Sequence, residues 1–170
     1  PAPLWRPDNP YSELHSPELP HRLLAAFRIW SIIDRFYPYK HLIGDWHAVL
    51  PEFIPRFEAA ETEDDYARAV LEMTARIADT HTIAYGHPAL SRIFGVASPP
   101  IEGRWIEQQF VVTRFHWAEV AQSGLSLGDV ILSIDDEPLA VRVASLQKYV
   151  AASTEIAQNL RAALLALRGP

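Results

Sequence analysis

Residues 124–138 read Gly-Leu-Ser-Leu-Gly-Asp-Val-Ile-Leu-Ser-Ile-Asp-Asp-Glu-Pro, and this segment is the most informative part of the chain. Gly124 and Gly128 bracket a tight connection in which positive φ angles are expected. The following residues alternate with the two-residue period of a β-strand. One apolar face of this strand would consist of Val130, Leu132 and Ile134. The last four residues are turn formers, so the residues alone fit any hairpin strand bounded by turns.

The composition is that of a globular protein with an acidic balance. The chain has 170 residues, of which 49% are hydrophobic and 21% charged, enough for one domain or two small ones. The formal net charge is −6 and no run of Lys or Arg occurs, so a nucleic-acid partner is not expected. No apolar run approaches the roughly 18 residues that cross a bilayer, so membrane insertion is not expected. Cysteine is absent, which removes disulfides and thiolate metal sites.

The N-terminal half is predicted to be helical after a short arm. Residues 1–15 contain several prolines and little periodicity, so an extended arm is expected. Ser16 and Pro17 form a typical helix start, as N-cap and first helical residue. Apolar residues then recur at three- and four-residue spacing up to Pro38, which should end the helix.

Two further helices are predicted in this half. Asp45 is a good N-cap for the second helix. Pro51 or Pro55 should kink or break that helix, because proline lacks a backbone donor and crowds the preceding turn. Thr62 is predicted to cap the third helix, which should run to about Asp79.

The segment Ala97-Ser98-Pro99-Pro100 is the predicted domain boundary. Residues 16–96 would then form a helical bundle with its connector, and residues 97–170 a second domain that contains strand. The chain opens with Pro1-Ala2-Pro3, without a Met or a signal-like segment. It is therefore expected to be a trimmed product or a piece of a longer protein.

The second domain is predicted to combine strand and helix. Trp105–Phe115 is predicted to be a strand. The prediction is clearest at Phe110–Thr113, where the residues are aromatic or β-branched. A short helix is expected over residues 141–150. Ser153 is predicted to cap a last helix, and Gly169-Pro170 is a typical stop signal.

Histidine is the residue type with the most chemical potential in this chain. No two histidines have the i, i+4 spacing of a helical metal site, and no acid-rich calcium loop occurs. Neither a Gly-x-Ser-x-Gly elbow nor a Gly-rich phosphate loop is present. No metal site and no cofactor is therefore predicted. The seven histidines are His15, His21, His41, His47, His81, His87 and His116.

His81 is singled out by its position in Ala78-Asp79-Thr80-His81-Thr82, where the third helix is predicted to stop. A histidine at a helix end, able to hydrogen-bond through both ring nitrogens, can act as a general base, because its ordinary pKa lies near neutral pH. The alternative is structural: the ring would satisfy the last carbonyls of its own helix. Position alone leaves both interpretations open.

The segment 124–138 resembles the Gly-Leu-x-x-Gly-Asp-x-Ile-x-x-Ile signature of PDZ domains attached to bacterial proteases. Roughly residues 20–170 are similar to the front half of the tricorn-like serine peptidases, in one family with the C-terminal processing peptidases. This resemblance implies an α+β fold, with an N-terminal three-helix bundle followed by a small PDZ-like strand/helix domain that could be incomplete at its C-terminus. The supporting motifs are Phe36-Tyr37-Pro38-Tyr39, Asp45-Trp46, Val49-Leu50-Pro51 and Asp79-Thr80-His81-Thr82.

The resemblance also implies roles for particular residues. His81 matches the general base that serves a serine on a separate, later catalytic domain, and Thr80 matches a hydroxyl residue that helps to orient this histidine. A PDZ-like domain implies peptide binding by strand addition. The residues expected to bind the peptide are Phe110, Val111, Val112 and Thr113. Two features depart from the family: Asp136 replaces a usual glycine, and the loop that holds a peptide carboxylate is not recognisable.

The resemblance implies that the chain is the N-terminal fragment of a serine endopeptidase acting on peptides or unfolded proteins. The nucleophilic serine would belong to an α/β core of the same polypeptide beyond residue 170, so the chain alone is expected to be inactive. A periplasmic or secreted location is expected on the same ground. The alternative is a non-catalytic peptide-binding or scaffolding module of the same architecture.

Overall fold

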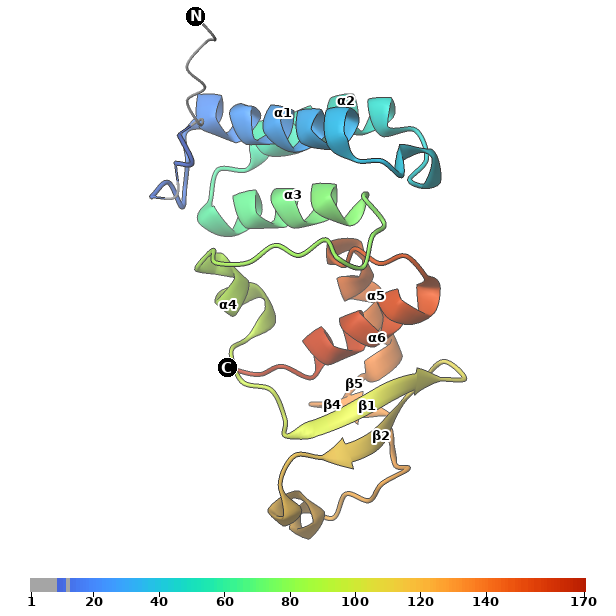
Figure 1. Cartoon of the computed structure of the whole chain (residues 1–170). Coiled ribbons are helices and arrows are strands. Elements are labelled where there is room, and N and C mark those ends of the chain that lie inside the picture. The colour runs from blue at the N-terminus through green and yellow to red at the C-terminus, as the bar shows by residue number, and fades with distance from the viewer. Residues whose placement is uncertain (1–8, 12) are drawn as a thin grey trace, which may run out of the picture.

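The computed structural model describes residues 9–11 and 13–170, so most of the predicted arm lies outside the described part. The chain is a mixed α+β protein in which helices stack in tiers above a small antiparallel sheet (Figure 1). The helices are α1 (Leu19–Phe36), α2 (Trp46–Ala59), α3 (Glu63–Ala75), α4 (Ala89–Phe94), α5 (Leu139–Leu146) and α6 (Glu155–Ala166), with 3-10 turns η1 (Lys40–Leu42), η2 (Ala118–Ser123) and η3 (Gln147–Tyr149). The strands are β1 (Ile101–Ile106), β2 (Gln109–Phe115), β3 (Val130–Ile131), β4 (Ser133–Ile134) and β5 (Glu137–Pro138).

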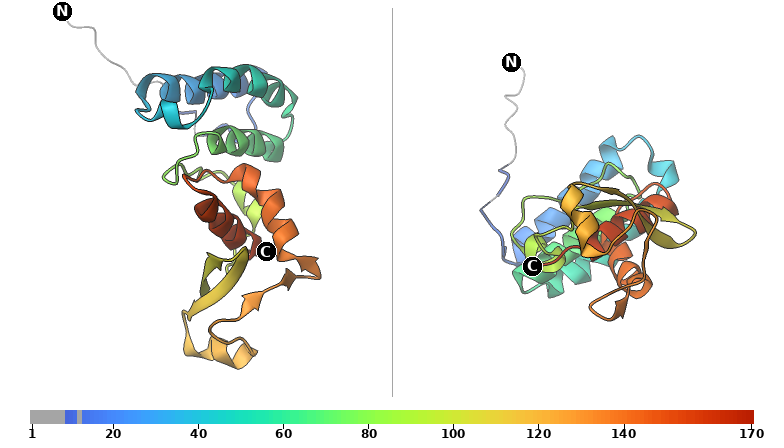
Figure 2. Two further views of the ribbon diagram at one scale, coloured as in Figure 1. Left: turned by 90° about the vertical axis from the view of Figure 1, so that its right-hand side faces the viewer. Right: turned by 90° about the horizontal axis from the view of Figure 1, so that it is seen from below.

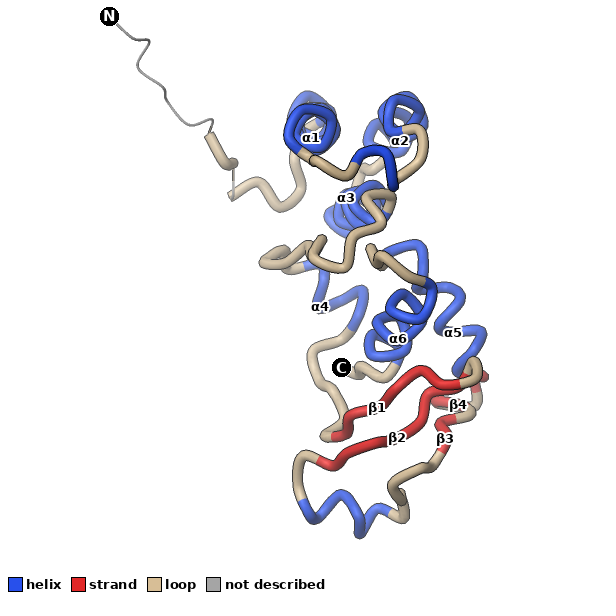
Figure 3. The backbone as a smooth tube through the Cα atoms, turned by 45° about the vertical axis from the view of Figure 1, so that its right-hand side comes forward, coloured by secondary structure: helices blue, strands red, loops and turns tan. Residues whose placement is uncertain are grey.

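Helices α1, α2 and α3 pack around one apolar core, farthest from the sheet (Figure 3). Phe53, Phe57 and Met73 are fully buried at its centre. The indole N–H of Trp30 donates to the carbonyl of Trp46 at 3.0 Å, and the indole N–H of Trp46 donates to the carbonyl of Trp30 at 3.1 Å. This reciprocal pair satisfies two polar groups next to the core and joins α1 to the start of α2.

Several predicted helix ends are confirmed. Tyr37 is extended (φ −78°, ψ 114°) and ends α1, as expected for the residue before proline. The Asp45 carboxylate accepts from the backbone N–H groups that open α2. The Thr62 hydroxyl accepts from the Asp65 N–H at 3.1 Å and so caps α3. Local side-chain chemistry therefore determines these ends.

The predicted start of the first helix is wrong, because Glu18 rather than Ser16 is the N-cap residue of α1. Pro20 then lies in the first turn, where a fixed φ and a missing N–H are tolerated. The predicted break in the second helix is also absent, since α2 runs through Pro51 and Pro55. Both prolines are exposed, so water can reach the carbonyls that they leave without a donor.

The third helix ends four residues earlier than predicted. It stops at Ala75, and the next residues make i→i+3 bonds from Arg76 to Met73 and from Ile77 to Thr74. Ala78 then has φ +52°, a left-handed conformation that an α-helix cannot continue through. His81 therefore lies in a loop after the helix and not in its last turn.

The predicted strand 105–115 is a hairpin. β1 and β2 pair antiparallel around a turn at Glu107-Gln108, whose φ angles of +48° and +64° suit a two-residue hairpin. β3 pairs with the other side of β2, so the sheet order is β1-β2-β3. The prediction missed the turn because Glu-Gln is not a usual turn pair.

The single apolar strand predicted over residues 130–134 is also wrong. β3 pairs with β2, whereas β4 forms a separate two-stranded ladder with β5 around Asp135-Asp136. Leu132 lies between them and is 72% exposed, because the chain changes ladder there. The expected positive φ angles of Gly124 (+90°) and Gly128 (+95°) are confirmed.

Helices α5 and α6 cover the sheet on the side toward α3 (Figures 1 and 2). Thr154, rather than the predicted Ser153, caps α6 by accepting from the Ala157 N–H. The predicted boundary near residue 97 is tied to the other end of the chain, since Ala97 and Gly169 exchange backbone hydrogen bonds. Across residues 9–11 and 13–170, no helix combines the length and apolarity that crossing a membrane requires.

Candidate functional site

The candidate site is built on the loop that follows α3. Thr80 fastens this loop to the segment before α6 by three contacts with Ser153. The backbone N–H of Thr80 donates to Ser153 Oγ at 3.1 Å, and the Ser153 N–H donates to Thr80 Oγ1 at 3.0 Å. The two hydroxyl oxygens are 3.2 Å apart. The loop therefore connects the packed helices α1, α2 and α3 to the part of the chain that contains the sheet.

Asp79 holds the imidazole of His81. Its Oδ1 accepts from the backbone N–H of His81 at 2.8 Å and lies 3.0 Å from His81 Nδ1. A carboxylate is an acceptor only, so Nδ1 carries the proton in this pair. In the neutral imidazole this leaves Nε2 without a proton and able to accept one. This is the tautomer that a general base requires.

Tyr37 supports Asp79 from the other side. Its hydroxyl donates to Asp79 Oδ2 at 3.0 Å, so both carboxylate oxygens are engaged. The hydrogen bonds from the His81 backbone and ring lower the pKa of Asp79, and Tyr37 adds to this effect. Burial, followed by the hydrogen bond to Asp79, raises the pKa of Tyr37. At neutral pH the pair is a phenol that donates to a carboxylate.

His81 itself is open to solvent. Its side chain is 97% exposed, while that of Asp79 is 23% exposed. The ring is bonded to Asp79 rather than to the last carbonyls of α3, which ends before it. The arrangement therefore differs from the helix-capping alternative and leaves Nε2 accessible to a group from outside.

The two predicted catalytic residues do not act on each other in this geometry. The Thr80 hydroxyl is engaged by Ser153, and Asp79 is the residue that orients His81. Asp79 and Tyr37 were both missed as site residues. A signal for Asp79 was present in the sequence, because an aspartate two residues before a histidine can reach both the backbone N–H and the ring of that histidine. No sequence signal links Tyr37 to Asp79, 42 residues away.

The predicted peptide-binding residues lie in β2, the central strand. Phe110 and Val112 are buried at 0% and 1% exposure, and Phe110 and Val111 pair with both neighbouring strands. Strand addition at these positions would require an edge that β2 lacks there. Thr113 is exposed, but its hydroxyl donates to the Glu102 carbonyl of β1. Of the three strands of this sheet, β1 and β3 are the edge strands.

The other His, Asp and Glu side chains form no second candidate site in the described part of the chain. Within residues 9–11 and 13–170, no group of three or more His, Asp or Glu side chains could hold a metal ion. His15 and His87 do meet, with ring centroids 5.6 Å apart, and His87 Nε2 contacts the His15 carbonyl. That pair docks the segment before α1 against the α3-to-α4 connector. Comparison with protein-family models and with curated proteins found no match for this chain.

Proposed function

We propose that this chain is the front part of a serine endopeptidase related to the tricorn-like family, with a three-helix bundle and a PDZ-like part. His81 would be the general base, and the nucleophilic serine would come from a catalytic region of the same polypeptide outside these residues. The substrates would be peptides or unfolded proteins. The main support is the Asp79–His81 pair, with Nδ1 held at 3.0 Å and the rest of the ring exposed.

The chemistry follows from that pair. The serine hydroxyl would donate its proton to Nε2 of His81 while its oxygen attacks the peptide carbonyl. Asp79 would keep the proton on Nδ1 and stabilise the imidazolium that forms. His81 would then return the Nε2 proton to the leaving amine. Exposure of His81 supports this role, because a serine from another domain must reach it.

The test uses the full-length gene product and a fluorophosphonate probe, which labels activated serines. We expect one labelled serine and a loss of about 10²–10⁴-fold in labelling rate in His81→Ala. His116→Ala, an exposed histidine in the sheet-containing part, is the matched control and should label normally. Labelling that survives in His81→Ala, or that falls only together with the melting temperature, would return His81 to a structural role.

A second candidate is a non-catalytic peptide-binding module. The supporting observation is the edge position of β1, at which an extended peptide could add as a further strand. Titration with extended peptides, followed by amide NMR shifts, should then move residues 101–106 first. Shifts at β1 together with a full-length protein that takes no probe would favour this module over the peptidase.

A further inference from the structure

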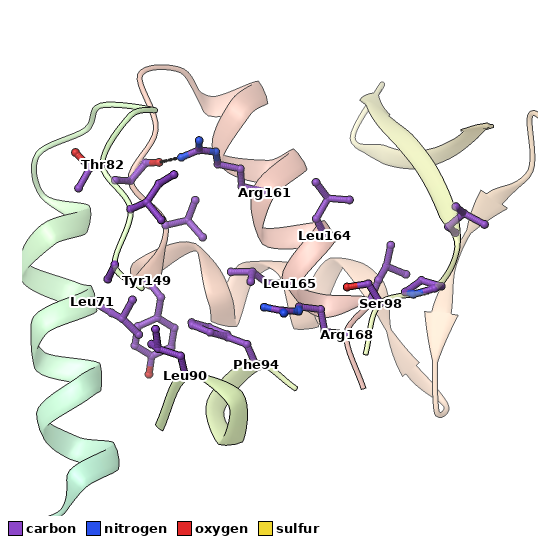
Figure 4. A pocket seen from close by; sticks show the side chains of 17 residues that line it. Leu71, Thr82, Leu90, Phe94, Ser98, Tyr149, Arg161, Leu164, Leu165 and Arg168 are labelled. Carbon is purple, nitrogen blue, oxygen red and sulfur yellow. Dashed lines mark hydrogen bonds between the residues drawn. The ribbon is translucent and has the colours of Figure 1, made fainter. Parts of the chain in front are cut away.

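A cavity of about 520 Å³ lies beside α6, between helix α3 and the start of strand β1 (Figure 4). Helix α6 lines one side of it, and α4 with the α3-to-α4 connector lines another. We call it the α6 pocket. Its volume falls in the range of about 300–1,000 Å³ that is typical of small-molecule sites.

The walls of the α6 pocket are mostly hydrocarbon. Ile83 and Leu164 are large apolar side chains that remain 65% and 42% exposed, although they face a hollow between elements. Filling the pocket with an apolar chain would remove this surface from water, which is favourable. The apolar wall includes Leu71, Ile83, Leu90, Phe94, Leu164 and Leu165.

The two charged residues of the wall are both arginines on or just after α6, and no carboxylate side chain is among its described lining residues. Arg161 lies at one end and donates to the Ala151 carbonyl at 3.0 Å. Arg168 lies at the other end and extends toward Phe94 (Figure 4). In a protein of net charge −6, this pocket is a locally cationic site.

Arg168 lacks a partner for a buried atom. Its Nε is buried and has no hydrogen-bond acceptor within the described part of the chain. The described part of the chain offers the guanidinium of Arg168 no hydrogen-bond or ion-pair partner. Because a carboxylate forms strong charge-assisted hydrogen bonds with a guanidinium, an anion at this end of the pocket would pair with the terminal nitrogens of Arg168.

We propose that the α6 pocket binds a medium-length hydrocarbon chain that ends in a carboxylate. The hydrocarbon lies along the leucines of α6 and α4, and the carboxylate pairs with Arg168. This inference is independent of the peptidase proposal, since none of Tyr37, Asp79 and His81 lines the pocket. The binding energy comes from apolar burial, and the preference for an acid comes from the arginine.

The test measures binding of octanoate and of octan-1-ol to the whole chain by calorimetry and amide NMR shifts. Octanoate should bind at least about tenfold more tightly than the alcohol, because its carboxylate pairs with the Arg168 guanidinium through a charge-assisted hydrogen bond and the neutral hydroxyl does not. Arg168→Gln should abolish this preference and leave binding of the alcohol unchanged. Arg35→Gln, the same charge change at an exposed position at the end of α1, should keep the preference.

A second variant guards against misfolding. Leu164→Glu places a negative charge at a partly exposed wall position, so the chain should fold while octanoate is repelled. Equal affinities for the acid and the alcohol, or an unchanged preference in Arg168→Gln, would reject the proposal. Absence of octanoate binding at millimolar concentration would also reject it. That holds even if a peptide with an apolar C-terminus binds in the pocket instead.

Discussion

The hydroxyl of Tyr37, just after α1, donates a 3.0 Å hydrogen bond to Oδ2 of Asp79, just after α3. Oδ1 of the same carboxylate holds the ring of His81. The orientation of the exposed histidine therefore depends on how α1 and α3 pack. Tyr37 and Asp79 meet because α1 and α3 end on the same side of the molecule (Figure 1). Tyr37 precedes a proline, and Asp79 follows Ala78, which has a left-handed conformation.

Tyr37→Phe removes one donor to Asp79 and keeps the ring. If His81 is the general base, turnover by the full-length protein should fall about threefold to tenfold with little change in KM, because the carboxylate orients His81 less firmly. Tyr39→Phe, at an exposed neighbouring tyrosine, is the matched control. Steady-state kinetics on a peptide substrate measures both variants. An unchanged kcat in Tyr37→Phe would show that this hydroxyl does not support the base.

Asp79→Asn tests the carboxylate by its pH dependence. The pKa of Asp79 in the folded protein lies below its ordinary value of 3.8, so the unfolded chain binds the proton more readily. The stabilisation from this group is complete above that ordinary value and is lost as the pH falls through the folded-state pKa. The melting temperature of the wild type should therefore drop more steeply than that of Asp79→Asn below about pH 4.

The control for this comparison is Asp136→Asn, which makes the same change on an exposed turn. Thermal melts followed by circular dichroism between about pH 6 and pH 3 supply the slopes. Parallel curves for wild type and Asp79→Asn would contradict the lowered pKa.

Thr80 and Ser153 should be coupled in stability rather than in catalysis. Each of Thr80→Val and Ser153→Ala breaks contacts between the loop and the segment before α6. In a double-mutant cycle, the free energy of unfolding should show a coupling of about 0.5–1.5 kcal/mol. Thr82→Val is the control within the same loop. Additive effects of the two substitutions would mean that the contacts do not form in solution.

Gly103→Ala should destabilise the sheet. A Cβ at this position would overlap the ring of Phe110, which packs over the glycine from the neighbouring strand. The cost should be about 1–3 kcal/mol, as for overpacking in a dense core. Phe110→Leu in the same chain should partly rescue Gly103→Ala, because it removes the clashing atoms. Chemical denaturation measures the free energy of unfolding of the single and the double variant. If Phe110→Leu gives no rescue, the clash with the Phe110 ring is not the cause of the destabilisation.

The sequence predicted the features that depend on neighbouring residues. Thr62 capped its helix and Pro38 ended one, because a cap and a pre-proline restriction act within four residues. The positive φ angles of Gly124 and Gly128 follow from the same local logic. The mixed α+β content was predictable for this reason.

The tertiary structure alone determined which groups meet and which face water. Leu132 fits an apolar strand pattern, yet it is exposed because the chain changes from one ladder to another around it. The contact of Tyr37 with Asp79 and the unsatisfied Nε of Arg168 depend on how separate helices pack. Such contacts arise from the burial of apolar faces across the whole chain, and local sequence does not encode them.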